Sequence, residues 1–281
     1  MQTEGSPAYQ AISSDDRRDL EKAVELLVSP TLTARLSSLI GKPVEKILEY
    51  APKWLEGKLQ TVVETALSKA ADAALWSLEN KKQEASPWWN KTYAAVSGGV
   101  GGFFGMAGLT VELPISTTIM MRAVADVARG EGFDLDDPYT KKACIEVFAL
   151  GGENKDDDES ETTYYAMRLF TAEVNNILAK ELAEMASKEA TNKLTSTQAG
   201  KWMSILIEKI SARFGIVITE KTAAQAVPVI GAASGAMINM MFTDFYQDMA
   251  SGHFTVKRLE NKYGFDLVRE EFEAIRKKKY L

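Results

Sequence analysis

Cysteine and histidine are almost absent from this chain. Its 281 residues include one cysteine, Cys144, and one histidine, His253. A single cysteine excludes an intrachain disulfide and a zinc site built on cysteines. A single histidine likewise excludes histidine-rich metal sites. Because Cys144 lies within the apolar run 143–150, we expect it to be a small buried hydrophobic residue.

The sequence also lacks an excess of basic charge and a leader-like N-terminus. The net charge is −6 and the isoelectric point is near 5.2, which argues against a general nucleic-acid-binding protein. No basic segment followed by an apolar run opens the chain, so we predict no signal peptide and a cytoplasmic location. A hydrophobic content of 46% with 26% charged residues is instead typical of a protein with a substantial core.

Helical patterns occupy most of the chain, and they predict an all-α fold. We expect a disordered tail over residues 1–13 and one domain of about ten helices over residues 14–281. Local signals mark several helix ends: Gly41 ends one helix, and Asp137-Pro138 begins another. The only strand-like run is the short segment Gly215–Thr219.

Two glycine-rich stretches, Ser97–Ala128 and Ala226–Ala250, are predicted to form the centre of the fold. Glycine inside a helix costs about 1 kcal/mol relative to alanine, so some other interaction must offset that cost. Glycines four residues apart on both stretches would let two helix backbones approach closely. The glycines predicted to form this close packing are Gly101, Gly105, Gly231 and Gly235. We expect Ser251-Gly252 to end the second central helix.

Two other interpretations of the first stretch are weaker. A phosphate-binding loop would need a GxGxxG pattern or a following lysine, together with a preceding strand, and the stretch has none of these. A permanent membrane span is disfavoured by Glu112 and Pro114 near its middle. Peripheral contact stays open, because Trp88 and Trp89 precede the glycines like an interfacial anchor. The basic segment 276–279 could add attraction to anionic lipid or simply suit a helix C-terminus.

Charged and polar residues interrupt both apolar stretches. If the two helices pack together, these residues could converge as a structural network, which we favour, or as a ligand or metal site. The candidate buried polar cluster consists of Glu112, Arg122, Asp126, Asn239, Asp244 and Asp248. Arg122 and Asp126 are also spaced for a pair within one helix. No catalytic residue, cofactor or metal site is predicted from these residues.

Several motifs resemble those of the EcsC family of bacterial proteins, over residues from about 27 to 280. The glycine-rich GGVGGFFGMAG is followed by ELP at residues 112–114 and by TT-x-MMR at residues 117–122. The second stretch contributes VPVIG at residues 227–231, and the end of the chain contributes RLE at residues 258–260. The resemblance implies an all-helical bacterial protein without an agreed biochemical activity. It supplies no catalytic residues.

Three hypotheses about function follow. The first is a non-enzymatic helical protein that contacts a membrane surface, a membrane-protein partner or a lipid-like apolar ligand through its glycine-rich helices. This protein would be cytoplasmic and, where it meets a membrane, peripherally attached. The alternative is a hydrolase-type or metal-dependent enzyme that uses the carboxylates as a cluster. A third interpretation is a scaffold whose centre serves packing alone.

Overall fold

The computed structural model describes residues 11–28, 30–51, 58–75, 105–150, 164–168, 172, 196–227 and 231–280. These residues form helices and no strand, which confirms the predicted all-α class. The elements are α1 (Ser14–Val28), α2 (Leu32–Ile40), α3 (Val44–Leu48), α4 (Leu59–Leu75), α6 (Gly105–Gly130), α7 (Pro138–Glu146), the short 3₁₀ helix η2 (Val147–Ala149), α9 (Ser196–Gln225), α10 (Gly231–Tyr263) and α11 (Phe265–Tyr280). Most of the predicted tail, residues 1–10, lies outside the described part.

Local capping chemistry sets several of the helix ends, and two of them, at Gly41 and Asp137, are those predicted from the sequence. The Thr31 side chain accepts a hydrogen bond from the Ala34 amide at the start of α2, and Gly41 ends that helix at φ 68°. At the start of α7, the Asp137 carboxylate accepts from the Tyr139 amide, and a proline follows at the first helical position. These contacts satisfy backbone groups that have no partner within their own helix.

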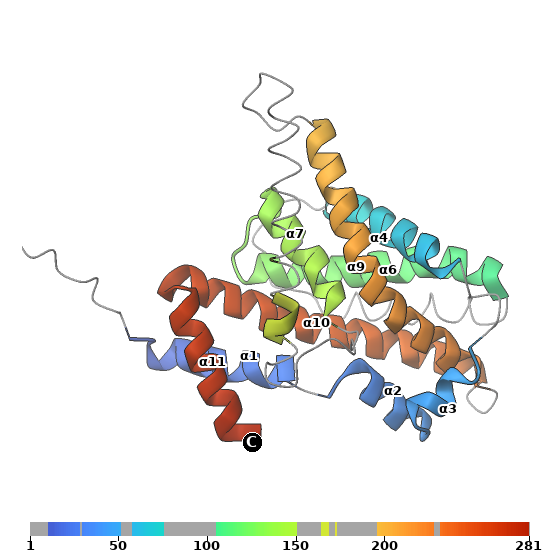
Figure 1. Ribbon diagram of the computed structural model, residues 1–281, viewed down its shortest axis with the longest axis horizontal. Coiled ribbons are helices and arrows are strands. Elements are labelled where there is room, and N and C mark those ends of the chain that lie inside the picture. The colour runs from blue at the N-terminus through green and yellow to red at the C-terminus, as the bar shows by residue number, and fades with distance from the viewer. Residues whose placement is uncertain are drawn as a thin grey trace, which may run out of the picture.

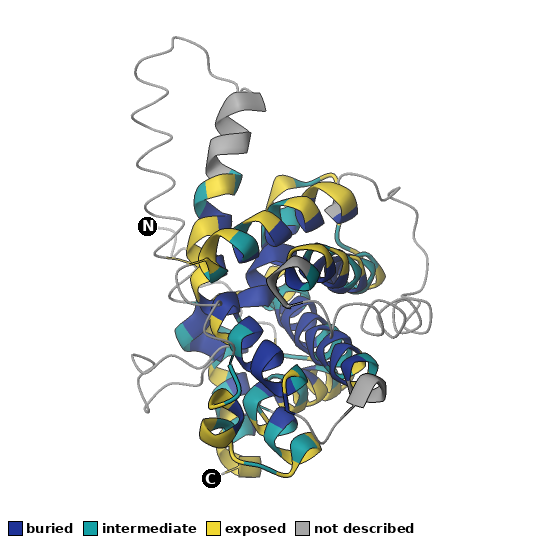
Figure 2. Ribbon diagram, turned by 90° about the vertical axis from the view of Figure 1, so that its right-hand side faces the viewer, coloured by how far each residue is buried: buried dark blue, intermediate teal, exposed yellow. Residues whose placement is uncertain are grey.

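The two predicted central helices, α6 and α10, lie against each other along the length of the molecule. Figure 1 shows α9 crossing them, with α4 beside α6 and α1 beside α10. Apolar side chains of α4, α6, α9 and α10 pack together inside. Figure 2 shows in dark blue where the ribbon carries buried residues. The predicted pairing of the two stretches is therefore present in the structure, as a contact between α6 and α10.

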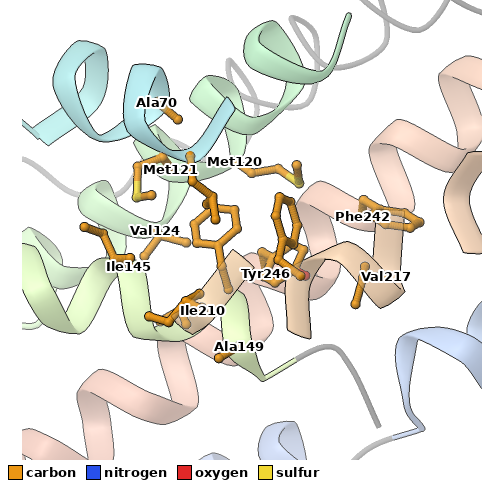
Figure 3. Close-up of a cluster of buried hydrophobic side chains, with 14 of the residues drawn as sticks. Ala70, Met120, Met121, Val124, Ile145, Ala149, Ile210, Val217, Phe242 and Tyr246 are labelled. Atoms are coloured by element: carbon orange, nitrogen blue, oxygen red, sulfur yellow. The ribbon is translucent and has the colours of Figure 1, made fainter. Parts of the chain in front are cut away.

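Aromatic side chains fill the middle of this core. Tyr246 of α10 stacks on Phe148 of η2 with ring centroids 4.8 Å apart, and Phe148 meets Phe214 of α9 edge-on at 5.1 Å. Figure 3 shows Tyr246 surrounded by aliphatic side chains that include Val124 of α6 and Ile210 of α9. Four elements distant in sequence are thus joined through one packed group. Cys144 is fully buried beside it, as expected, and burial raises the pKa of its thiol.

A second group of buried residues lies where α1, α11 and the C-terminal half of α10 meet. It contains Leu20, Val256, Leu259 and Phe272, with Tyr164 and Tyr165 packed on Phe272. Gly264, at φ 91°, ends α10 in a conformation that favours glycine. The chain then reverses into α11, which returns across α1 (Figure 1).

The strand-like interpretation of Gly215–Thr219 is wrong, because α9 runs through this segment without interruption. Its β-branched residues favour a strand locally, but helical spacing places Phe214, Val217 and Ile218 together on the buried side of α9. Tertiary burial therefore decides the conformation here.

The predicted helix end at Ser251-Gly252 is also wrong. The helix α10 continues through both residues to Tyr263. A methyl group added to Gly252 would lie 2.6 Å from Leu27 Cγ and 3.1 Å from the carbonyl oxygen of Ala23, both on α1. Gly252 is therefore a packing glycine at the crossing of α10 and α1, and glycine serves here to admit a neighbouring helix.

Candidate functional site

The most deeply buried charged pair in the described structure joins α6 to α9. The Lys221 ammonium donates to Glu112 Oε1 at 2.7 Å, and it lies 3.3 Å from the Ser116 hydroxyl oxygen. Lys221 is 1% exposed and Glu112 is 6% exposed, so water screens the pair little. The Asn239 amide of α10 donates to the same Glu112 oxygen at 3.2 Å. Three helices therefore meet at one carboxylate.

Helical register explains why these polar residues are buried. On α6, Glu112, Leu113 and Ser116 all lie on the side that packs into the protein. On α9, Lys221 follows Phe214 and Ile218 along the buried stripe at helical spacing. Its ammonium lies 5.7 Å from the centroid of the Phe242 ring. The surrounding packing therefore holds the charge of Lys221 next to Glu112.

The sequence predicted two members of this group, Glu112 and Asn239, and it missed two others, Lys221 and Ser116. A lysine is usually exposed, so Lys221 did not stand out. A signal was nevertheless present. The positions of Phe214, Val217 and Ile218 extend at spacings of three and four residues to Lys221. We call Glu112, Ser116, Lys221 and Asn239 the buried polar cluster from here on.

The other predicted members lie elsewhere. Arg122 is exposed and donates to the backbone carbonyl of Ala73 on α4 at 3.4 Å. Asp126 accepts from Arg129, one turn further along α6, at 2.6 Å. The structure therefore does not bring all six predicted residues to one point.

The two aspartates of α10 also lie apart from the cluster. Asp248 accepts two hydrogen bonds from the Arg35 guanidinium of α2, each at 3.1 Å. Asp244 is partly buried one turn before Asp248. Asp248 thus connects α10 to α2. It lies further along α10 than Asn239, the residue that contacts α6.

A shared metal site receives no support from these carboxylates. Glu112, Asp126 and Asp248 each have a lysine or arginine partner at 3.1 Å or less. Within the described ranges, no group of three or more potential metal-ligating side chains comes together. A divalent ion needs several oxygen ligands at roughly 2–2.6 Å, and the geometry of these carboxylates offers no such set.

The glycines predicted to form the close α6–α10 contact are only partly visible. Gly101 lies outside the described residues. Gly105 and Gly231 are helical, but their burial and packing are not among the described features. Gly235 is buried on α10. The glycine at which the structure shows a close approach of two helices is instead Gly252, beside α1.

A second buried polar group lies at the other end of α10. The Tyr164 hydroxyl lies 3.2 Å from His253 Nδ1, and Arg168 donates to that hydroxyl at 3.2 Å. Arg168 also makes two 2.9 Å hydrogen bonds to the Glu260 carboxylate. Burial, with the cation of Lys257 nearby, holds the pKa of His253 well below its usual value. This imidazole is therefore neutral, and it links α10 to the helical residues 164–168.

Among the described residues, no single helix is long and apolar enough to cross a membrane. The pair α1 and α2 meets the length and composition requirement only jointly, with a bend of 59° between the two helices.

Comparison with known proteins gives one match. A model of the EcsC protein family matches residues 10–259. No curated protein matches the chain. No solved structure matches it either.

Proposed function

The chain belongs to the EcsC protein family, and we propose that it is a non-enzymatic helical protein that binds a membrane surface peripherally. The binding surface consists of the outer sides of α6 and α10 near their N-terminal ends. The proposed partner is a lipid bilayer, and a membrane protein or a single bound lipid are the competing outcomes of the test.

The observation that carries the proposal is a set of exposed apolar side chains on these two helices. On α6, Val111 is 63% exposed and Ile115 is 47% exposed, one turn apart. On α10, Met237 is 52% exposed and Met240 is 37% exposed, also one turn apart. We call these four residues the apolar surface. They flank Glu112 and Asn239 in sequence, and the hydrogen bond between those two residues marks where the helices meet.

Exposed charged residues are absent from the same helix segments. Between Gly105 and Met121 the only charged residue is Glu112, which is buried and paired with Lys221. Between Gly231 and Thr243 there is no charged residue. These segments can therefore enter an apolar phase without the large cost of desolvating an exposed charge.

The expected strength of this contact fits reversible attachment. Full burial of one such side chain contributes about 1.5–3 kcal/mol, and four partly exposed ones contribute less than four times that amount. The loss of translational and rotational freedom on binding reduces the net binding free energy by several kcal/mol. Peripheral, concentration-dependent binding is the result that we expect.

Flotation with phosphatidylcholine vesicles tests the proposal. The wild-type chain should float with the vesicles, and the variants V111S/I115S and M237S/M240S should bind at least tenfold more weakly, because each removes two apolar contacts. The controls are Leu48→Ser on α3 and Ile216→Ser on α9, which alter apolar residues that are 38% and 40% exposed and lie outside the apolar surface. Both controls should bind like the wild type.

One result would contradict membrane binding, and another would contradict the proposed binding surface. One is a wild-type chain that stays in solution with vesicles but carries a lipid in native mass spectra, which would make it a lipid carrier. The other is vesicle binding that neither double variant weakens, which would place the contact elsewhere on the chain.

A further inference from the structure

The methionines of the chain differ sharply in exposure, and the exposed ones belong to the apolar surface. Met237 and Met240 are 52% and 37% exposed, the highest values among the methionines whose side chains the structure describes. They are three residues apart on α10 and therefore share one face of that helix. Met120 and Met121 of α6 and Met249 of α10 are almost completely buried. Within the described ranges, the thioethers most open to a reagent in water thus lie in the proposed binding surface.

The cysteine thiol does not compete with them for an oxidant. Cys144 is the only cysteine of the chain, and it is fully buried in the core. Burial raises the pKa of its thiol, so the reactive thiolate is scarce at neutral pH. A peroxide in solution therefore meets accessible thioethers rather than a reactive thiol.

The two halves of the apolar surface differ in chemistry. The helix α6 contributes Val111 and Ile115, whose side chains are hydrocarbons without sulfur. The helix α10 contributes Met237 and Met240, whose thioethers can accept an oxygen atom. Methionine sulfoxide is polar, and its oxygen would have to lose its hydration to enter an apolar phase. Oxidation therefore acts on one half of the surface and leaves the other half apolar.

The packed core tolerates oxidation at these two positions. Because Met237 and Met240 are partly in solvent, water can hydrate a sulfoxide oxygen on either side chain while the helices stay packed. Oxidation of Met120 or Met121, which are 1% and 0% exposed, would instead place a polar oxygen in the core and destabilise the fold. The difference in exposure allows the surface to change without unfolding.

We propose that Met237 and Met240 are sites of reversible oxidation by peroxide, and that their sulfoxides weaken the binding of the chain to the membrane. This inference rests on the proposed function and adds a means of regulation to it. In the forward step the sulfur lone pair attacks one peroxide oxygen, the O–O bond breaks as the S–O bond forms, sulfur loses two electrons, and the second oxygen leaves as water. In the reverse step two thiols of a methionine sulfoxide reductase supply two electrons and become a disulfide, the S–O bond breaks, and the oxygen leaves as water.

Flotation with phosphatidylcholine vesicles, before and after treatment of the full chain with hydrogen peroxide, tests this regulation. Peptide mass spectrometry identifies the oxidised methionines, and circular dichroism checks that the treated chain stays helical. Met237 and Met240 should be oxidised before Met120, Met121 and Met249. The oxidised chain should bind at least about tenfold more weakly, because two apolar contacts are lost. Incubation with the two methionine sulfoxide reductases, one for each sulfoxide epimer, should restore binding.

Two variants separate oxidation at these positions from other effects of peroxide. M237L/M240L keeps apolar side chains of similar size without sulfur, so peroxide should not reduce its binding. Met203→Leu is the control, because Met203 of α9 is partly buried against the core and lies outside the apolar surface. This variant should lose binding on oxidation as the wild type does. Each protein is compared with itself before and after peroxide, so a difference in starting affinity does not affect the result.

The outcomes distinguish the two proposals. Unchanged binding after both exposed methionines are oxidised overturns the regulation and leaves membrane binding intact. Two other results overturn it as well: M237L/M240L that loses binding like the wild type, and oxidation of the buried methionines first. Loss of binding that the reductases do not reverse shows damage rather than regulation. A wild-type chain that binds no vesicle before oxidation overturns the proposed function itself, and the regulation with it.

Discussion

Lys221 of α9 donates a 2.7 Å hydrogen bond to Glu112 of α6, and both side chains are almost completely removed from water. An ion pair in this environment does not necessarily stabilise the fold, because desolvation of the two charges can cost as much as their attraction returns. What it does provide is specificity. Any other register of α6 against α9 would bury one charge without the other.

Removing one partner of this pair should therefore be more damaging than removing both. We expect Lys221→Met to lower the free energy of unfolding by about 3–5 kcal/mol, since it leaves the Glu112 carboxylate buried and unpaired. The double variant E112L/K221M should be closer to the wild type than that single variant. Urea denaturation of the two single variants and the double variant gives the coupling energy.

The control for that cycle is the exposed pair Lys46 and Glu49 on the surface at α3, which has a similar distance of 2.7 Å. Its coupling energy should stay below about 1 kcal/mol, because solvent screens it. Equal coupling energies for the buried and exposed pairs would show that burial has no part in the effect.

Two glycines inside helices should respond to alanine in opposite directions. A methyl group on Gly252 would lie 2.6 Å from Leu27 Cγ, whereas one on Gly215 would come no closer than 4.0 Å to Leu59 Cδ2. Both alanines gain up to about 1 kcal/mol of helix propensity. Only Gly252→Ala adds an overpacking cost of about 1–3 kcal/mol. We therefore expect Gly215→Ala to stabilise the protein and Gly252→Ala to destabilise it.

Thermal or urea unfolding of these two variants gives the sign of each change directly. Stabilisation by Gly252→Ala would mean that α1 can move away from α10 at little cost. Close packing of the two helices would then not explain why a glycine occupies position 252.

The sequence predicted the fold best where chemistry is local. Gly41 and Asp137 act through backbone groups within a few residues, so their effect can be predicted without knowing which residues lie near them in space. Gly252 shows the opposite case. Glycine is common at helix ends, and only the position of Leu27 on another helix shows that it serves packing here.

Only part of the candidate site was predicted, because its residues come from different helices. Glu112 and Asn239 stand out as polar residues in apolar helices, and the structure brings them into contact. Spacing along one helix cannot show which residue of a third helix will meet them, so Lys221 was missed. Asp248 looked equally unusual in the sequence, but Arg35 of a distant helix is its partner.

Asp16 should be important for holding the start of α1 to the end of α10. Its carboxylate accepts hydrogen bonds from Lys262 at 2.6 Å, Tyr263 at 2.6 Å and Ser13 at 2.8 Å. Asp16→Asn should lower the free energy of unfolding by about 1–3 kcal/mol at pH 7, because hydrogen bonds to a charged acceptor are lost. The neighbouring exposed residue gives the control, and Asp15→Asn should change stability by less than about 0.5 kcal/mol.

Acid should reproduce the effect of that substitution. The hydrogen bonds from Lys262 and Tyr263 hold the pKa of Asp16 well below its usual value. The folded state therefore keeps this carboxylate ionised while the unfolded state takes up a proton, and stability is lost as the pH falls below about 4. The decrease in the free energy of unfolding below about pH 4 should be smaller in Asp16→Asn than in the wild type. An equal decrease in the two proteins would contradict the role proposed for the carboxylate.

The single histidine should give the protein a distinct pH dependence above that range. His253 is buried, and burial together with the cations Lys257, Arg168 and Lys142 holds its pKa well below the usual value. Below about pH 6.5 the unfolded chain binds a proton that the folded chain does not bind. Stability should therefore fall as the pH falls from about 7.5 to about 5.5, with a slope of up to about 1.4 kcal/mol per pH unit below about pH 6.5.

Urea denaturation across this range, for the wild type and for His253→Gln, isolates the histidine because the chain has no other. The variant loses the hydrogen bond between His253 Nδ1 and the Tyr164 hydroxyl, so its free energy of unfolding at about pH 7.5 should be lower than that of the wild type. Its decline with falling pH should nevertheless be shallower, since glutamine does not titrate. The difference between the two slopes is the decisive quantity. A His253→Gln protein that declines as steeply as the wild type would show that the imidazole can take up its proton in the folded state, and the buried imidazole would then not be held neutral.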